Sequence, residues 1–384
     1  MNDMGHKSLS KQTHRLAIGT YFFIAGITFA SWASRIPDIK HKLELNDAEL
    51  GGILFALPTG SMVSLPISGW LVAKLGSRTV MLLAALCYPL VLSLLGTADS
   101  VVVLTSLLFF FGLLGNMMNI SVNTQAVAVE ELYGKSIMAS FHGIWSLAGF
   151  TGAAVGTVMI SFGLIPLQHF LIVALTMMAM ALIMKFGRMP KDAVTGNQPI
   201  FVKPDASLLK LGLISFCCMA AEGTMFDWSG IYFQKVVQAP PSLVTLGYSA
   251  FMGTMALGRF LGDGLVLRFG RKEILQASGG IIAAGLLMAV FFPSIVTATI
   301  GFLMVGFGVS SVVPIVYSQA GKSEKMSPGM ALAAVSSIGF FGFFIGPPLI
   351  GFIAEAFGLQ WSFGIIAILG FGTTILARFT KFKT

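Results

Sequence analysis

Long apolar runs separated by short polar stretches dominate this chain of 384 residues. A helix of about 20 apolar residues is long enough to cross a bilayer, and uninterrupted runs of that length form helices rather than strands. The pattern therefore predicts an all-α polytopic membrane protein with about twelve transmembrane helices. The runs lie near residues 16–36, 48–73, 79–96, 101–128, 137–162, 165–186, 208–234, 243–267, 274–292, 296–319, 329–356 and 359–378.

Composition supports a chain whose solvent is lipid. Hydrophobic residues make up 55% and charged residues only 10%, whereas a soluble domain carries about 25% charged residues. The three cysteines lack metal-ligand spacing, and the chain contains no GK[ST] phosphate loop, HExxH or GxSxG motif. We therefore expect the lipid bilayer as its surroundings, and no metal, no cofactor, no enzymatic activity and no nucleic-acid partner.

The net charge of +8 is better explained by membrane topology than by a nucleic-acid surface. Lysine and arginine gather in loops that fall on one side together with both termini, and that side is cytoplasmic by the positive-inside rule. These loops contain Lys74/Arg78, Lys135, Arg188–Lys203, Arg268–Lys272 and Lys322/Lys325. The loop 35–49, with Arg35, Lys40 and Lys42, is the main exception. We expect a monomer in the inner membrane with both termini in the cytoplasm.

The chain divides into two similar halves. The polar stretch 188–207 is predicted to be a cytoplasmic linker between six-helix bundles at 1–187 and 208–384. Gly149, Gly152 and Gly156 recur 190 positions later as Gly339, Gly342 and Gly346, and GWLVAKLGSR (69–78) is matched by DGLVLRFGRK (263–272). Two pseudo-symmetric six-helix bundles are typical of alternating-access transporters, which bind solutes at the midplane between the repeats.

Several motifs resemble a known family. GWLVAKLGSR after the second helix resembles the loop signature of the major facilitator superfamily. The chain is similar, more narrowly, to the MosC-like branch of that superfamily, which includes rhizopine-transport-type proteins. The resemblance implies the major facilitator fold and a transporter of small polar solutes. The segments that carry it are WASRIPDIKHKL (32–43), NTQAVAVE (123–130), MASFHGIWSLAGFTGA (138–153), EGTMFDWSGIYF (222–233), GRFLGD (258–263) and GFFGFFIGPPLIGFIAE (339–355).

Two positions depart from what the resemblance implies. Superfamily members often carry an acid where Ala73 stands, so a latch between this loop and the opposite half is expected to be weaker. Relatives in the branch often carry an acid where Asn119 stands, which weakens the case for a proton role of the fourth helix.

Glu222 and Asp227 lie in an otherwise apolar stretch, 208–233. A charge near the bilayer centre costs about 2.5–3.5 kcal/mol on insertion scales, and ion or substrate handling is the usual compensation. Glu222 is therefore the candidate proton-coupling and substrate-binding group, with a purely structural contact to a neighbouring helix as the alternative. Five residues rotate a helix by about 140°, so Asp227 does not share the face of Glu222.

Asp227 is expected nearer the outside, at the level of Arg35. In this superfamily the first and seventh helices flank the central cavity, so we predict that Arg35 and Asp227 form an ion pair that gates the outer mouth. The alternative is an arginine that extends to the membrane interface. Arg259 and Asp263, four residues apart near the cytoplasmic end of the eighth helix, are predicted to form a second gating pair.

Polar and aromatic residues on four helices complete the predicted substrate site. Asn116, Asn119 and Asn123 share one helix face, and their amides suit hydroxyl-rich solutes or serve as interhelical hydrogen bonds. Ser31 and Trp32 lie on the first helix. His142 on the fifth helix is a candidate for proton relay or for a structural role. Trp145, Trp32 and Trp228 could stack on a sugar-like ring, although tryptophan also prefers membrane interfaces.

These features predict a secondary active transporter that moves a small polar solute by alternating access, with protons as the coupling ion. We expect this solute to be sugar-like or cyclitol-like. The suggestion of a cyclitol rests on the resemblance alone. A multidrug-type exporter of amphiphilic compounds and a non-transporting membrane solute sensor are the alternatives.

Overall fold

The computed structural model describes residues 11–133, 137–184, 205–320, 323 and 328–380. The predicted linker 188–207 lies almost entirely outside this range, as do Lys135, Lys322 and Lys325. The helices are α1 (Lys11–Ser34), α2 (Ile36–Lys42), α3 (Asp47–Leu54), α4 (Ala56–Leu75), α5 (Ser77–Leu95), α6 (Val101–Tyr133), α7 (Met138–Ser161), α8 (Pro166–Met184), α9 (Ala206–Lys235), the 3-10 turn η1 (Pro241–Leu243), α10 (Leu246–Phe269), α11 (Arg271–Phe291), α12 (Ile295–Ser310), α13 (Val312–Ala320), α14 (Pro328–Phe357) and α15 (Leu359–Arg378).

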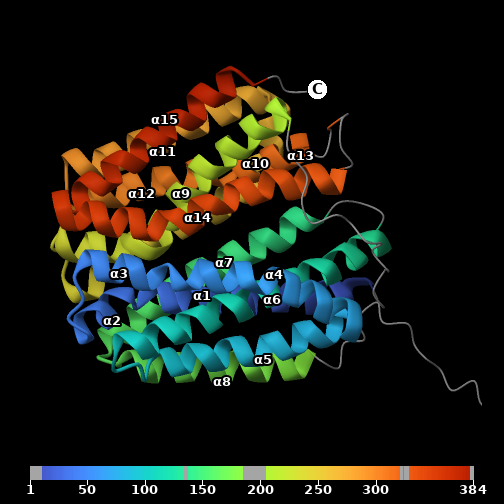
Figure 1. Ribbon diagram of the computed structural model, residues 1–384, viewed down its shortest axis with the longest axis horizontal. Helices are drawn as coiled ribbons and strands as arrows, with labels where there is room; N and C mark the ends of the chain where they lie inside the picture. The colour runs from blue at the N-terminus through green and yellow to red at the C-terminus, as the bar shows by residue number, and fades with distance from the viewer. Residues whose placement is uncertain (1–10, 134–136, 185–204, 321–322, 324–327, 381–384) are drawn as a thin grey trace, which may run out of the picture.

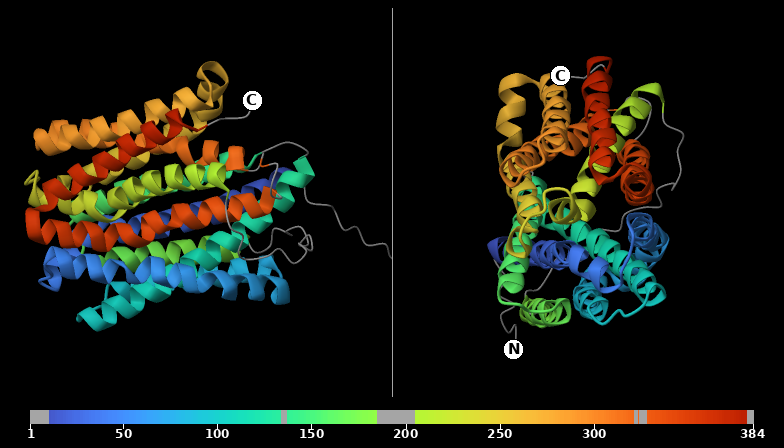
Figure 2. Two further views of the ribbon diagram at one scale, coloured as in Figure 1. Left: turned by 45° about the horizontal axis from the view of Figure 1, so that its top comes forward. Right: turned by 90° about the vertical axis from the view of Figure 1, so that its left-hand side faces the viewer.

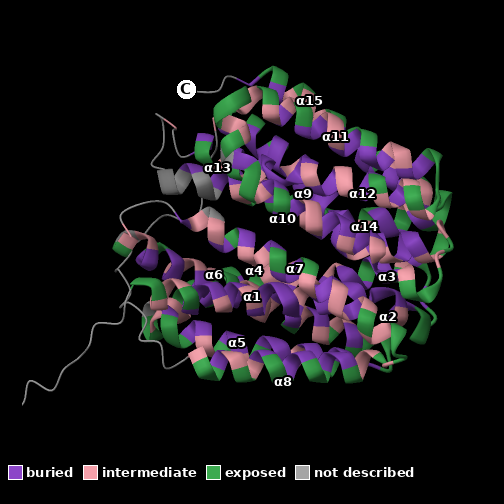
Figure 3. Ribbon diagram, turned by 180° about the vertical axis from the view of Figure 1, so that it is seen from behind, coloured by how far each residue is buried: buried purple, intermediate pink, exposed green. Residues whose placement is uncertain are grey.

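The helices form two bundles, α1–α8 and α9–α15, called here the N-half and the C-half (Figure 1). The end of the molecule where α1 begins and α15 ends is called the inner end, and the opposite end the outer end. The ribbons of the two halves lie adjacent at the outer end and move apart toward the inner end (Figures 1 and 3). The end-on view in Figure 2 shows the bundles side by side.

Eleven spans in the described residues are long and apolar enough to cross a membrane. The helix α10, with 24 residues, is the twelfth long element and coincides with the predicted run at 243–267. It is not among the eleven because its described part is interrupted at Asp263. The all-helical prediction is therefore confirmed.

Two of the predicted runs are each split into two helices. The run at 48–73 divides at Phe55 into α3 and α4, and the run at 296–319 divides at Ser311 into α12 and α13. Proline follows three residues after each break, as Pro58 and Pro314. Proline has no N–H to donate to the carbonyl four residues earlier, so the helical hydrogen-bond ladder is interrupted at these points. In contrast, α14 continues through Pro347 and Pro348.

Small residues bring the central helices into close contact. A Cβ added to Gly152 of α7 would lie 2.6 Å from the Cβ of Ala30 on α1. In the C-half, a Cβ on Gly342 of α14 would lie 2.6 Å from the carbonyl oxygen of Phe216 on α9. The repeated glycines therefore perform the same packing role in both halves, as expected for small residues at helix interfaces. Gly346 is an exception, since its added Cβ would meet nothing within 4 Å.

The central position of α1 and α9 follows from their burial. In each of these spans 78% of the most apolar window is buried, compared with 33% for α8 (Figure 3). Because α1 and α9 are equivalent helices of the two repeats, their polar residues are the ones that face protein rather than lipid. This places Glu222 and Asp227 on one of the two innermost helices.

The loop 35–49, the main exception to the positive-inside pattern, lies at the outer end, and its basic side chains are bonded to nearby acceptors. Lys40 bonds to the carboxylate of Asp47, and Lys42 Nζ donates to the carbonyl oxygen of Ala98 at 2.6 Å. Arg35 is only 2% exposed and has three partners within the N-half. All three cations are thus held by acceptors, and the loop does not behave as a free positive charge.

Candidate functional site

Arg259 is the residue at which both halves meet at mid-depth. Its Nη2 atom donates to Glu222 Oε1 of α9 at 3.3 Å, and its Nη1 atom donates to Ser146 Oγ of α7 at 2.5 Å. Its guanidinium also lies over the ring of Trp145, with 5.8 Å from Cζ to the ring centroid. One side chain of the C-half therefore contacts a carboxylate of its own half together with a hydroxyl and an aromatic ring of the N-half.

Helix geometry places this contact near the membrane centre. Glu222 lies thirteen residues before Lys235, where α9 ends, and Arg259 lies thirteen residues after Leu246, where α10 begins. At 1.5 Å per residue, both are about 20 Å from the outer end of their helices. The side chains of Glu222 and Arg259 are 8% and 16% exposed, so the two charges lie in a largely desolvated place.

An aromatic cluster adjoins the ion pair on its outer side. Phe226, one turn beyond Glu222, stacks on Phe343 of α14 with the ring centroids 6.2 Å apart and meets Phe29 of α1 edge-on at 5.2 Å. Trp145 and Tyr248 lie 6.1 and 6.3 Å from the same ring. Phe226 is therefore enclosed by rings from both halves, and the site combines polar groups with flat apolar walls.

The predicted pairing of Arg259 with Asp263 falls outside the part of the chain that the structure describes, and among the described residues Arg259 has another partner. Arg259 bonds to Glu222, which comes from a neighbouring helix and which sequence spacing could not connect to it. The side chain of Asp263 lies outside the described residues. The structure thus joins two predicted site residues that had been assigned to separate roles.

The predicted ion pair between Arg35 and Asp227 is not formed in the part of the chain that the structure describes. Arg35 donates to Asp38 Oδ2 at 2.8 Å, to the Leu164 carbonyl oxygen at 2.8 Å and to His169 Nδ1 at 3.1 Å. All three acceptors belong to the N-half and lie near the end of α1. Because these groups occupy the guanidinium within its own bundle, Arg35 does not reach across to α9.

The asparagines of α6 divide into two groups. Asn116 donates to the Ser61 carbonyl oxygen at 2.9 Å and so joins α6 to α4. Asn123 donates to Asn119 Oδ1 at 2.7 Å, and Asn119 is exposed. Asn116 therefore makes the interhelical hydrogen bond that was the alternative interpretation, whereas Asn119 and Asn123 keep an accessible amide pair.

Three predicted substrate contacts are buried. Trp32 and Trp228 are 1% and 0% exposed, and Ser31 donates to the Ile27 carbonyl oxygen of its own helix at 2.8 Å. Trp228 lies one turn from Tyr232, whose hydroxyl donates to Ala289 of α11 inside the C-half. The tryptophan that accompanies the ion pair is Trp145.

His142 occupies an accessible position on α7, one turn before Ser146. Its ring meets Phe22 of α1 edge-on, with 5.5 Å between the centroids. His142 also interacts electrostatically with Arg259. It thus lies on the inner side of the ion pair, between that pair and the inner end.

The sequence did not single out Ser146 as a partner of Arg259, nor Phe226 as the centre of an aromatic cluster. A lone serine on an apolar helix carries no distinctive signal, and Phe226 is one of 33 phenylalanines. The only available hint for Ser146 was its position on the same face as His142 and Trp145.

The geometry is that of a polytopic membrane transporter: two repeated helical halves with charged groups meeting between them at mid-depth. The sequence model of the Major Facilitator Superfamily matches residues 17–325. The chain belongs to this superfamily.

Named relatives agree with the family. The chain is 36% identical over 348 residues to an uncharacterised transporter of the same superfamily from Yersinia pestis, covering 91% of each chain. It is 32% identical over 370 residues to the membrane protein MosC of Rhizobium meliloti, covering 95% of this chain and 89% of MosC. The resemblance to the MosC-like branch is thereby confirmed.

Solved structures share the fold at low sequence identity. The nucleoside transporter NupG has a TM-score of 0.74 at 16% identity, and the match covers 94% of this chain and 98% of NupG. A bacterial homologue of the human lysosomal transporter Spinster, in an inward-facing and unoccupied conformation, has a TM-score of 0.76 at 15% identity, with 98% and 97% coverage. These likenesses establish the major facilitator fold for this chain.

Proposed function

We propose that this transporter moves a small polar, sugar-like or cyclitol-like solute across the inner membrane by alternating access, with protons as the coupling ion and both termini in the cytoplasm. The observation that carries the proposal is the Arg259–Glu222 ion pair, which lies at mid-depth and extends to Ser146 of the opposite half. A charged contact shared by both halves is sensitive both to what binds between them and to how they are arranged.

The groups around the pair suit a solute rich in hydroxyls. Arg259 has five N–H donors, and in the described residues it donates to Ser146 and Glu222 only. A hydroxyl can accept from such a guanidinium and donate to the adjacent carboxylate of Glu222. The ring of Trp145 supplies a flat apolar surface beside these groups. The amide pair of Asn119 and Asn123 on α6 is proposed as a separate polar contact for the solute.

Glu222 is the group proposed to carry the proton. When ionised, it neutralises Arg259; when protonated, it loses the charge that attracts the guanidinium. The proton state of Glu222 therefore changes how firmly Arg259 is held, and Arg259 is also bonded to the other half through Ser146. His142, on the inner side, is the candidate relay between Glu222 and the inner end.

Flux into liposomes tests this proposal. A thermal-shift screen of purified protein with sugars and cyclitols first identifies a ligand, and its uptake is then measured with and without a proton gradient. We expect a gradient to drive accumulation in the wild type and not in Glu222→Gln. Glu49→Gln, at an exposed acid that caps α3, is the matched control and is expected to behave as wild type.

Other outcomes would overturn the proposal. Flux that ignores the gradient and is unchanged in Glu222→Gln would remove proton coupling, and binding without any flux would favour a solute sensor.

A multidrug-type exporter is the second candidate, favoured by the aromatic cluster around Phe226. Such a cluster can accommodate amphiphiles without directional hydrogen bonds. If amphiphilic cations stabilise the protein in the thermal-shift screen and sugars and cyclitols do not, the exporter is the better description.

A further inference from the structure

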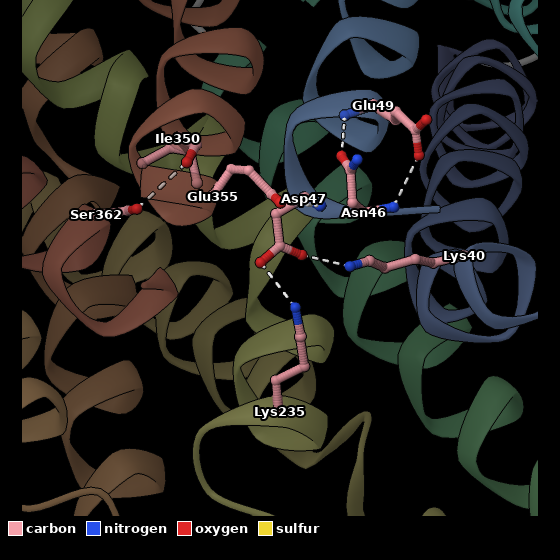
Figure 4. Close-up of polar contacts among 8 residues, drawn as sticks. All are labelled: Lys40, Asn46, Asp47, Glu49, Lys235, Ile350, Glu355 and Ser362. Carbon is pink, nitrogen blue, oxygen red and sulfur yellow. Dashed lines mark hydrogen bonds and ion pairs between the residues drawn. The ribbon is translucent and has the colours of Figure 1, made fainter. Parts of the chain in front are cut away.

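Asp47 is a buried carboxylate to which both halves contribute a lysine. Its Oδ1 atom accepts from Lys40 Nζ of the N-half, and its Oδ2 atom accepts from Lys235 Nζ of the C-half at 2.8 Å (Figure 4). Asp47 is only 3% exposed. Each oxygen of the carboxylate therefore accepts a hydrogen bond from a lysine of a different half of the protein.

A second bond from the same residue reaches a second helix of the C-half. The backbone N–H of Asp47 donates to Glu355 Oε2 of α14 at 3.1 Å. Lys40 and Lys235 carry two positive charges, and Asp47 and Glu355 carry two negative charges, so the cluster is neutral as a whole. Asp47 thereby connects α3 to both α9 and α14 at the outer end.

The backbones meet directly beside this cluster. A Cβ on Gly51 would lie 2.7 Å from the carbonyl oxygen of Pro347 and 2.9 Å from the Cα of Gly351. A Cβ on Gly351 would lie 2.5 Å from the carbonyl oxygen of Asp47 itself. Contact as close as this leaves no room for water, so α3 and α14 are in contact along one helical turn.

Local sequence fixes the carboxylate in this position. The Asn46 side chain accepts from the Glu49 backbone and the Glu49 side chain accepts from the Asn46 backbone, which together form a capping box at the start of α3 (Figure 4). Asp47 is thus the first residue of the helix, where the helix dipole favours negative charge. The cap belongs entirely to the N-half, so it does not depend on contact with the C-half.

We infer that Asp47 is the gating residue of the outer end, which holds the outer-closed conformation and releases Lys235 and Glu355 when that end opens. This role is the one that sequence reasoning had given to Arg35 and Asp227. Arg35 cannot perform it in this arrangement, because its ionic partner Asp38 belongs to the same half.

The two lysines make the contact reversible. When α3 leaves α14 and α9, Asp47 keeps Lys40 as a partner, so no buried charge is left alone. Lys235, whose side chain is already 48% exposed, moves into water. Ion pairs with an exposed partner contribute little to stability, so breaking the bond between Lys235 and Asp47 is not the main cost of opening. The inference is independent of the identity of the solute and of the coupling ion.

Distance measurements between spin labels test this role. Labels at Asp99 in the N-half and Ser242 in the C-half, both exposed at the outer end, report the separation of the halves there. The native Cys87, Cys217 and Cys218 are replaced by alanine in the labelled background. Lys235→Gln is the main variant, because Asp47 keeps Lys40 and the N-half keeps its own contacts.

We expect Lys235→Gln to raise the ratio of outer-open to outer-closed molecules by roughly 1.5- to five-fold, the change that corresponds to an ion pair with an exposed partner. Asp38→Asn is the matched control, since it removes an ion pair of the same loop that does not cross the halves. Asp47→Asn is expected to increase the open fraction further, because it removes the acceptor of Lys235.

A distance distribution that is unchanged in Lys235→Gln would overturn the inference. So would an equal shift in Lys235→Gln and Asp38→Asn, because that result would show a general loosening of the loop. Loss of folding in Asp47→Asn alone would not affect the decision, since Lys235→Gln answers the question without leaving Lys40 unpaired.

Discussion

Arg259 Nη2 lies 3.3 Å from Glu222 Oε1, and the two side chains come from helices that run in opposite directions through the C-half. The pair lies at mid-depth, and Ser146 extends it into the N-half. A single cation therefore links the groups proposed to bind solute and proton with the interface that moves during transport.

Removing one member of the pair is expected to destabilise the protein more than removing both. Arg259→Gln leaves the buried carboxylate of Glu222 without its cation, at a cost of about 3 kcal/mol. The double variant Arg259→Gln/Glu222→Gln has no unpaired charge and is expected to unfold at a higher temperature than Arg259→Gln. Thermal unfolding in detergent measures this, and strict additivity of the two single changes would contradict it.

Ser146→Ala is expected to change the transport rate while the fold is retained. A hydrogen bond to a charged group is worth about 1.5–3 kcal/mol, so loss of the bond to Arg259 corresponds to about ten-fold or more in an equilibrium between conformations. Ser161→Ala on the same helix is the control, since the Ser161 hydroxyl is exposed and bonds to its own helix. Flux of an identified solute into liposomes is the readout, and equal rates for both variants would refute the prediction.

Two glycines of the repeated pattern are expected to differ in their tolerance of a methyl group. Gly152→Ala places a Cβ 2.6 Å from that of Ala30 and is expected to destabilise the protein by about 1–3 kcal/mol through overpacking of α1 against α7. Gly346→Ala meets nothing within 4 Å and is expected to be nearly neutral. The unfolding temperatures of the two purified variants test this prediction. An equal decrease in unfolding temperature for both variants would show that the packing argument fails.

Charge reversal distinguishes Asp38 from Asp227 as the ionic partner of Arg35. We expect Arg35→Glu to reduce folded yield, because three acceptors in the N-half lose their donor. Adding Asp38→Arg is expected to restore part of that yield, whereas adding Asp227→Arg is not. Size-exclusion profiles of the expressed variants provide the measurement. If Asp227→Arg restored the folded yield instead, an ion pair between Arg35 and Asp227 across the halves would be the better interpretation.

Much of the fold could be predicted from the chain because lipid imposes a simple rule. Each run of about 20 apolar residues must satisfy its backbone hydrogen bonds internally, and only a helix does so. The repeated glycines indicated two similar halves, and Gly152 and Gly342 make close helix contacts in the two halves. The breaks at Phe55 and Ser311 were less visible, since Pro58 and Pro314 interrupt runs whose apolar character continues.

Partners of the charged side chains were harder to predict. Helical spacing suggested Arg259 with Asp263, and depth suggested Arg35 with Asp227, because spacing and depth are all that one sequence provides. Among the described residues, Arg259 pairs with Glu222 and Arg35 pairs with Asp38, and both contacts depend on which helix faces lie against each other.

The sequence by itself determined that this protein spans the membrane with two similar halves and that Glu222 lies at mid-depth, since these follow from hydropathy and repeat spacing. Only the tertiary structure decided that Arg259 neutralises Glu222 and that Asp47 joins the halves through Lys235. The physical reason is that an ion pair requires atoms within about 4 Å, and such proximity between distant segments is set by helix packing rather than by position along the chain.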